Sequence, residues 1–315
     1  MHSLFDACLM GQGNHVFVPS VSSAETVQTW GSNIQHGAFG AGYAAMVCGT
    51  GALGAYYSSN FTAFTNVALP TSSNYTDTQF DSTNALFLSV SYSTSKAAYT
   101  ADPTSNPWSA AASFPLSGGS MRLATIGGIT VALQSGGSFT AYARSTNGGT
   151  SWSSGTFPDS RAITDVFPCG SVFMALASTG DVYTSSTGLT GSWTKNALVL
   201  SAGSWFGASN GTRAVAFKTG TNTFAYSDNS GVSFTTGTLG ASGGFTRVRW
   251  TGTMFVAHDI TVGSQKFYYS QTGDAFSSHN LPSVTWGTAL VVLSPIKVLL
   301  AGNNKSCIVT LGSYT

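Results

Sequence analysis

Residues 139–152 read FTAYARSTNGGTSW, an apolar stretch that ends near Tyr142, then a cluster of small polar residues and glycines, then Trp152. The same order recurs along the chain. Tyrosines occupy the equivalent place at intervals of 41 to 43 residues: Tyr57, Tyr99, Tyr142, Tyr183, Tyr226 and Tyr269. The polar cluster after each tyrosine ends on an aromatic residue: Phe64, Trp108, Trp152, Trp193, Phe234 and Phe276.

Each repeat contains four strand-like segments. Around the quoted stretch, residues 122–126 and 129–133 flank the turn Gly127-Gly128, residues 139–144 follow, and an outer segment runs from Trp152 to Pro158. Glycine pairs between short apolar runs are typical of tight hairpins, and proline suits an outer edge strand. Repeats of about 40–50 residues built from short strands indicate a β-propeller with one four-stranded blade per repeat. We therefore predict an all-β chain that forms a single β-propeller.

The two ends of the chain predict how the ring closes. After residue 286 there are three strand-like segments, at 287–292, 297–301 and 306–311, and residues 26–30 resemble an unpaired outer strand. Pairing them gives seven four-stranded blades and removes the exposed edges of an open array; six or eight blades are the alternatives. The predicted domains are an N-terminal arm at 1–13 and a propeller at 14–315, whose closing blade is shared between about 14–30 and 285–315.

The polar cluster carries a recognisable motif. Residues 145–152 (STNGGTSW) and 227–234 (SDNSGVSF) resemble the Asp-box, or bacterial neuraminidase repeat, with the pattern Ser-x-Asp-x-Gly-x-Thr-Trp. Both copies have Asn where that family prefers Asp. The resemblance implies a turn in which the side chain caps backbone amides and glycine supplies a positive φ. It also implies that the motif marks the fold and not a site of chemistry.

Sialidases are the enzymes to which this resemblance points. The active site of that family uses three arginines that bind a substrate carboxylate, a tyrosine nucleophile assisted by a glutamate, and an aspartate that acts as acid and base. This chain has one glutamate, Glu25, and most of its aspartates fall in turns, where Asp usually caps the backbone. We therefore predict a protein that is not an enzyme, and keep a glycoside hydrolase only as a second alternative.

The composition limits the partners. Charged residues make up 7% of the chain and the formal net charge is +1, which argues against binding nucleic acid or an anionic membrane surface. No apolar run approaches the ~20 residues that cross a bilayer. The five histidines are scattered and the four cysteines lack metal-ligand spacing, so we expect neither a metal nor another cofactor.

One set of residues is a candidate ligand site. Six side chains lie near the predicted starts of inner strands and could surround the mouth of a central channel: His36, Arg122, Arg161, Trp205, Arg247 and Trp286. Arginine and aromatic residues suit a sugar or a protein ligand. The alternative, which the sequence favours, is that the tryptophans pack between blades and the arginines only solubilise the rim.

The functional prediction follows from low charge, richness in Gly, Ser and Thr, and an opening stretch without the features of a signal peptide. These resemble a virion-associated or surface-appendage protein of a tailed bacteriophage, structural or adhesive, assembled in the cytoplasm and later exposed on a virion or cell surface. Its expected partners are other virion proteins and host surface glycans. A carbohydrate-binding propeller lectin is the first alternative.

Overall fold

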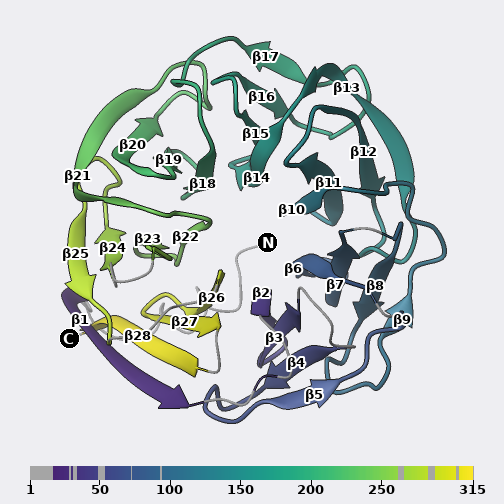
Figure 1. The fold of residues 1–315 in the computed structure, drawn as a ribbon, viewed down its shortest axis with the longest axis horizontal. Coiled ribbons are helices and arrows are strands. Elements are labelled where there is room, and N and C mark those ends of the chain that lie inside the picture. Colours follow the sequence, from purple (N-terminus) through teal and green to yellow (C-terminus); the bar gives the residue numbers. More distant parts are fainter. Residues whose placement is uncertain are drawn as a thin grey trace.

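A computed structural model describes residues 17–27, 30, 34–48, 54–71, 73–92, 94–261, 266–282, 288–302 and 305–314. Across these ranges there are 28 strands, and none of the residues forms a helix that could span a membrane. The strands group into seven sets of four around one axis (Figure 1). The predicted all-β propeller is therefore confirmed.

Each blade is numbered in chain order, with its innermost strand given first. Blade 1 consists of β2 (Ile34–Gly40), β3 (Tyr43–Cys48), β4 (Ala55–Ser58) and β5 (Thr65–Val67). Blade 2 consists of β6 (Tyr75–Asp81), β7 (Leu86–Ser91), β8 (Ala97–Thr100) and β9 (Ser109–Ala110). Blade 3 consists of β10 (Ser120–Ile126), β11 (Ile129–Ser135), β12 (Phe139–Ser145) and β13 (Ser153–Arg161). Blade 4 consists of β14 (Ile163–Cys169), β15 (Val172–Ala177), β16 (Val182–Ser185) and β17 (Thr194–Asn196).

The remaining blades complete the ring. Blade 5 consists of β18 (Trp205–Ser209), β19 (Ala214–Lys218), β20 (Thr221–Ser227) and β21 (Thr235–Gly243). Blade 6 consists of β22 (Val248–Trp250), β23 (Phe255–His258), β24 (Lys266–Ser270) and β25 (Ser277–Asn280). Blade 7 consists of β26 (Ala289–Ser294), β27 (Lys297–Gly302), β28 (Lys305–Tyr314) and β1 (Phe17–Val27). Blades 3 and 4 merge into one eight-stranded sheet through a single parallel pair, Ser135 with Ile163.

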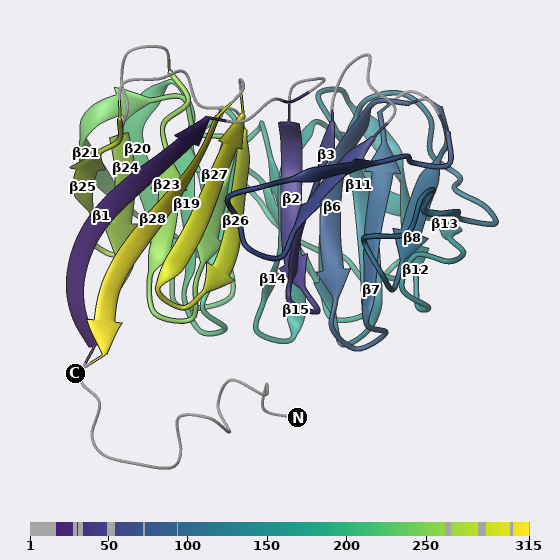
Figure 2. The ribbon, with the colours of Figure 1, turned by 90° about the horizontal axis from the view of Figure 1, so that it is seen from below.

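Strand β1 closes the ring by pairing antiparallel with β28, from Phe17 opposite Tyr314 to Val27 opposite Lys305 (Figure 2). Closure by the two terminal strands is thus confirmed. The predicted location of the outer strand at residues 26–30 is wrong, because β1 ends at Val27. The outermost strand faces solvent, with residues 18–20, 22 and 24 exposed, so apolar and polar residues do not alternate along it. Residues 1–13, the predicted arm, lie outside the described residues.

The two box-like turns adopt the capping geometry that their residues predict. Ser145 Oγ accepts the Gly149 N–H at 3.0 Å, while the side-chain oxygen of Asn147 accepts the Ser151 N–H at 3.1 Å. Gly149 has a φ of +80°, which favours glycine. Ser227 and Asn229 repeat these contacts in blade 5, at 2.9 and 3.0 Å. Asn therefore replaces Asp as the accepting side chain without loss of the turn.

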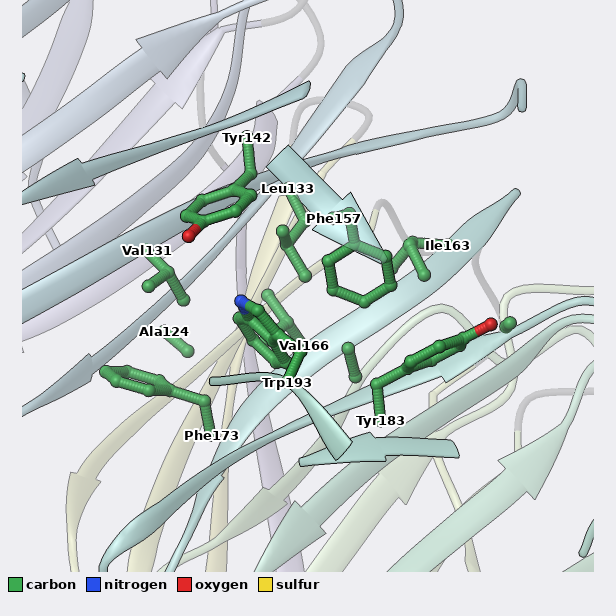
Figure 3. Close-up of a cluster of buried hydrophobic side chains, with 12 residues drawn as sticks. Ala124, Val131, Leu133, Tyr142, Phe157, Ile163, Val166, Phe173, Tyr183 and Trp193 are labelled. Atoms are coloured by element: carbon green, nitrogen blue, oxygen red, sulfur yellow. The ribbon is translucent and has the colours of Figure 1, made fainter. Parts of the chain in front are cut away.

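Aromatic residues fill the space between neighbouring blades (Figure 3). Trp193, which follows the polar cluster of blade 4, lies 6.0 Å from Tyr142 of blade 3 and 5.0 Å from Phe157, measured between ring centroids. Burying one such side chain contributes about 1.5–3 kcal/mol, so these contacts hold the blades together. Because the interfaces are apolar, charged residues that are buried near the axis stand out.

Candidate functional site

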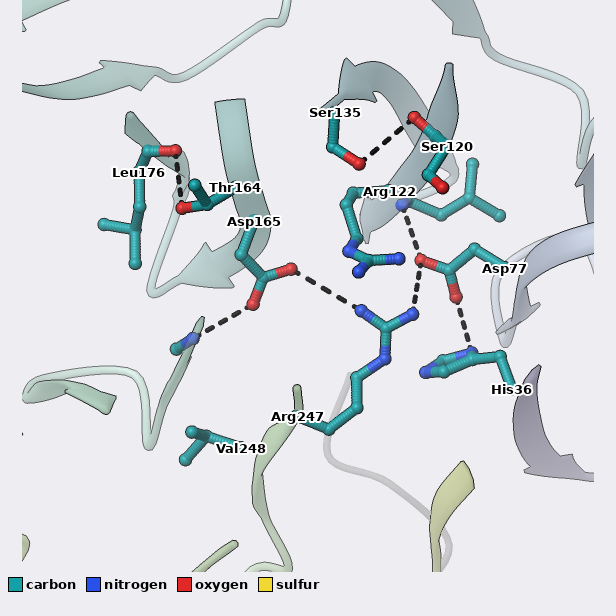
Figure 4. A network of polar contacts seen from close by, with 12 residues as sticks. His36, Asp77, Ser120, Arg122, Ser135, Thr164, Asp165, Leu176, Arg247 and Val248 are labelled. Atoms are coloured by element: carbon teal, nitrogen blue, oxygen red, sulfur yellow. Dashed lines mark hydrogen bonds and ion pairs between the residues drawn. The ribbon is translucent and has the colours of Figure 1, made fainter. Parts of the chain in front are cut away.

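Six ionisable side chains from the inner part of the ring meet near its axis, and we call them the channel cluster. They are His36, Asp77, Arg122, Asp165, Arg247 and Arg249 (Figure 4, which labels all but Arg249). The exposed fractions are 0% for His36, 2% for Asp77, and 3% for both Asp165 and Arg247. Buried charges are rarely found unless they are paired or functional.

Irregularities in three inner strands coincide with cluster residues. The pairing register shifts between Ile34 and His36 in β2, between Tyr75 and Asp77 in β6, and between Ile163 and Asp165 in β14. An extra residue in a strand changes which side the following side chains face. Each bulge thus directs a polar side chain toward the axis. Without it, the side chain would face the apolar space between blades.

Both carboxylate oxygens of Asp77 have polar partners. Oδ1 lies 2.5 Å from His36 Nδ1, and Oδ2 accepts the backbone N–H of Leu123 at 3.0 Å and lies 3.5 Å from Arg247. Burial would raise the pKa of Asp77, but the adjacent imidazole and the Arg247 guanidinium outweigh it and hold that pKa below its ordinary value. Asp77 is therefore an anion at the axis.

A Thr-Asp pair connects blades in two places. The hydroxyl of Thr76 accepts the N–H of Met121 at 3.1 Å, just before Asp77 accepts that of Leu123. In the same way Thr164 accepts the N–H of Trp205 at 3.3 Å, and Asp165 accepts that of Gly207 at 2.9 Å. Each pair thus binds the innermost strand of the next blade. The channel cluster is built on these inter-blade contacts.

His36 is fixed in one neutral tautomer. Its Nε2 lies 2.6 Å from an Arg249 terminal nitrogen, and a guanidinium can only donate, so Nε2 must be an acceptor. Nδ1 therefore carries the proton that is donated to Asp77. Burial, followed by the positive charge of Arg247, lowers the pKa of His36 to about 3. Both ring nitrogens are already engaged.

The cluster has more positive than negative charge. Three guanidiniums face two carboxylates, which leaves a formal excess of +1 with His36 neutral. Burial, and then repulsion from Arg247, lowers the pKa of Arg122 and of Arg249 to about 10. Burial raises the pKa of Asp165 despite the nearby arginines, which weakens its value as a counter-charge. The site is thus poised to favour an added anion.

Cluster residues line several cavities, among them a top, a throat and a bottom cavity. We call the end of the ring at which the inner strands begin the top face. A top cavity of about 380 Å³ lies there, lined by Arg122, Ser135, Gly136, Ala162, Ile163, Thr164, Ser178, Ser204 and Phe206. A throat cavity of about 80 Å³ shares Arg122 with it and is lined by Gln35, Thr76, Ser120, Arg122, Thr246, Arg247 and Thr288. A bottom cavity of about 180 Å³ includes Asp77, Asp165, Arg247, Arg249 and Trp250 in its lining.

Within the described ranges, no three His, Cys, Asp or Glu side chains gather as a metal site requires.

The structure brings only three of the six predicted site residues together. His36, Arg122 and Arg247 come together in the channel cluster, so the alternative of rim-solubilising arginines is wrong for Arg247, which is buried. Trp205 is fully buried and donates its indole N–H to the Ser201 carbonyl at 2.8 Å, which makes it a core residue. Trp286 lies outside the described residues.

Arg161 does not belong to the ring of inner-strand residues. It ends the outer strand β13 and pairs with Asp181 of blade 4, with Nε 3.2 Å from the carboxylate. Only Ala162 separates β13 from the next inner strand, so the sequence shows no loop between the two. The proximity of Arg161 to β14 in the sequence therefore wrongly suggested that Arg161 starts an inner strand.

Sequence reasoning missed Asp77, Asp165 and Arg249. The signal for the aspartates was the repeated pair Thr76-Asp77 and Thr164-Asp165, which are 88 residues apart, or two repeat periods. The signal for Arg249 was its spacing of two from Arg247, because alternate residues of a strand face the same side.

No protein-family model matches the chain, and a search of curated proteins finds no match. Solved structures with the same architecture are numerous. Virginiamycin B lyase from Staphylococcus aureus has a TM-score of 0.76 at 11% identity, covering 93% of this chain and 100% of that one. YCF48 bound to D1 peptide has a TM-score of 0.68 at 16% identity, covering 93% and 95%. The WD40 propeller domain of Doa1 has a TM-score of 0.71 at 9% identity, covering 93% and 97%.

These comparisons correct the functional prediction. The structures just named are a lyase, a YCF48 protein and a WD40 domain, and not phage structural or adhesion proteins, so the virion-associated assignment is wrong. They do not favour the lectin alternative either. The small uncharged polar residues that suggested a virion surface are used here in turns such as those at Ser145 and Ser227. At identities of 9–16% the likeness shows the β-propeller fold and no activity of this chain.

Proposed function

We propose that this protein is a non-catalytic binding propeller that recognises an acidic segment of a peptide at its top face, with Arg122 as the anchor. The observation that carries the proposal is the state of Arg122. Its guanidinium forms no ion pair among the described residues and lies 5.7 Å from the centre of the Phe206 ring. An arginine beside an aromatic ring in a partly closed pocket is typical of residues that dominate binding energy.

The top cavity fits such a ligand. Its volume of about 380 Å³ is within the ~300–1,000 Å³ range of ligand pockets and suits a few residues of an extended chain. Phe206 and Ile163 provide apolar contact, while hydroxyls of Ser135, Ser178 and Ser204 line the same space. YCF48, which has the same architecture, is a propeller that binds a peptide. The two box-like turns further support a relationship to Asp-box propellers.

The non-catalytic part of the proposal is supported by the state of the His36–Asp77 pair. A histidine that acts as a general base needs a free ring nitrogen within reach of the substrate. His36 is fully buried, donates from Nδ1 to Asp77 and accepts from Arg249 at Nε2. Its pKa of about 3 is also far from a value suited to proton transfer at neutral pH. We therefore assign the pair to holding Asp77 and Arg249 in place.

Selection from a random peptide display library tests the proposal. The wild-type protein should enrich peptides that contain Asp or Glu or that end in a free carboxylate, and Arg122→Gln should lose that enrichment. Arg144→Gln is the matched control, since Arg144 also lies in blade 3 but donates to the Thr187 carbonyl away from the channel. Equal enrichment by Arg122→Gln and wild type would refute the role of Arg122.

The same variant has a second expected result, on stability. Within the described part of the chain Arg122 makes one weak hydrogen bond, at 3.4 Å to the Met121 carbonyl, and its charge adds to a positive excess. Arg122→Gln should therefore leave the midpoint of urea unfolding unchanged or raise it, whereas removal of a merely structural residue would lower it. A loss of binding caused by unfolding can be recognised in this way.

A further inference from the structure

The throat cavity is a polar chamber inside the ring. Every residue that lines it has a polar or charged side chain: Gln35, Thr76, Ser120, Arg122, Thr246, Arg247 and Thr288. No carboxylate is among the described residues that line it. At about 80 Å³ it is well above the ~10–15 Å³ that a single water needs, and it is smaller than a pocket for an organic ligand.

Three hydrogen-bond donors around this cavity have no partner among the residues that the structure describes. Arg247 Nε, Arg122 Nε and Thr246 Oγ1 are buried and form no hydrogen bond to any described residue. Arg247 is 97% buried by side chain, and its ion pairs with Asp77 and Asp165, at 3.5 and 3.9 Å, are longer than hydrogen bonds. A buried donor left unpaired costs about 1–3 kcal/mol, and more when it is charged. Donors in this state indicate a ligand that supplies acceptors.

The charge balance points to the same kind of ligand. The channel cluster has a formal excess of one positive charge, and burial of the arginines lowers the pKa of Arg122 to about 10. One bound anion would neutralise the excess in a region of low dielectric, where a counter-charge interacts strongly. Arginine presents its donors in a planar fork that matches the oxygens of a carboxylate or a phosphate.

We propose that the throat cavity binds one small oxyanion, held by Arg122, Arg247 and Thr246. The chemistry is that of a carboxylate, phosphate or sulfate group. Such a group can come from a free ion or from the carboxyl end of a longer ligand that enters through the top cavity, since Arg122 lines both spaces. The inference does not depend on peptide recognition, because Arg247 and Thr246 lie outside the top cavity.

Isothermal titration calorimetry in a low-chloride buffer at pH 7 tests the site. Phosphate, sulfate and acetate are titrated separately, followed by tetraglycine with a free carboxylate and tetraglycine with a C-terminal amide. Saturable binding with one site per chain is expected for at least one of the oxyanions or for free tetraglycine. Binding of the free ions identifies an ion site, and binding of free but not amidated tetraglycine alone identifies a site for a chain end.

The matched variants locate the binding. Thr246→Val removes one hydroxyl at nearly constant volume and should weaken binding roughly ten- to a hundredfold, the effect of one hydrogen bond to a charged group. Arg122→Gln should weaken it at least as much, while Arg144→Gln should bind like the wild type. The proposal is overturned if no oxyanion and no free peptide binds, or if Thr246→Val and Arg122→Gln bind as tightly as the wild type. If the wild-type protein binds phosphate but does not select acidic peptides, the proposed function is rejected and the anion site in the throat cavity stands.

Discussion

Asp77→Ala is expected to lower the free energy of unfolding by about 3–5 kcal/mol, the usual cost of removing one partner from a buried ion pair. The substitution takes an acceptor from His36 Nδ1 and from the N–H of Leu123, and raises the positive excess of the channel cluster by one. It also removes one of the two carboxylates near Arg247. Urea unfolding followed by tryptophan fluorescence measures the loss.

Asp102→Ala is the control for this prediction. Asp102 is an exposed turn residue that accepts the Thr104 N–H at 2.9 Å, so its removal costs one solvent-accessible cap and should have a much smaller effect. If Asp77→Ala unfolds within about 1 kcal/mol of the wild type, Asp77 is not a central electrostatic residue of the ring. Asp77→Asn, which keeps one acceptor, should fall between the two.

Protein stability is expected to fall as the pH drops from 6.5, by up to about 1.4 kcal/mol per pH unit. The pKa of His36 is about 3 in the folded protein and 6.5 unperturbed, so below pH 6.5 the unfolded chain binds a proton that the folded one does not. The loss continues toward pH 3. Protonation would also place two donors face to face, because Nε2 now accepts from Arg249.

The two aspartates of the channel cluster modify the pH dependence of stability at low pH. The pKa of Asp77 is lowered by folding, so its contribution to stability is lost only below about pH 4. The pKa of Asp165 is raised, chiefly by burial, so it acts in the opposite direction as the folded state takes up a proton first. Between pH 6.5 and about 4.5 the decrease should therefore come mainly from His36.

Unfolding free energies at pH 7.5, 6.5, 5.5 and 4.5 check the sign and the residue. His36→Gln keeps one donor and one acceptor but cannot titrate, so its stability should vary much less over this range. His279→Gln alters a half-buried residue of the outer strand β25 and should retain the wild-type slope. An equal slope in His36→Gln and wild type would show that another group causes the pH dependence.

The parts of the fold that were predicted from sequence are those fixed by local interactions. The turn from Ser145 to Trp152 depends on residues within the turn itself, and its repetition at Ser227 reveals the period of the ring. Ring closure followed from counting strands at the two ends. The limits of β1 were missed because an outer strand that faces solvent needs no apolar alternation.

The candidate site was only partly predictable, for a geometric reason. Asp77 and Asp165 look like turn residues, and their direction is set by bulges that shift the register by one residue. A bulge depends on pairing with the neighbouring strand, so it leaves no simple pattern in the sequence. Trp205 was left open between the rim and the core, because a large aromatic residue at the start of an inner strand fits both, and its burial confirms the favoured alternative of packing between blades.

The pairing of β1 with β28 has a consequence for how the chain assembles. Blades 1 to 6 each form from one contiguous segment, whereas blade 7 joins residues nearly three hundred positions apart, Phe17 and Tyr314. Contacts of such long sequence separation are slow to form because the chain must first lose the entropy of a very large loop. Ring closure should therefore be the last step of folding.

A circular permutant that connects residues 314 and 17 and opens the chain between β9 and β10 would turn this pairing into a local hairpin. Its ring would form faster, but it would be held closed only by the contacts between blades 2 and 3, which include the hydrogen bonds of Thr76 and Asp77 to the start of β10.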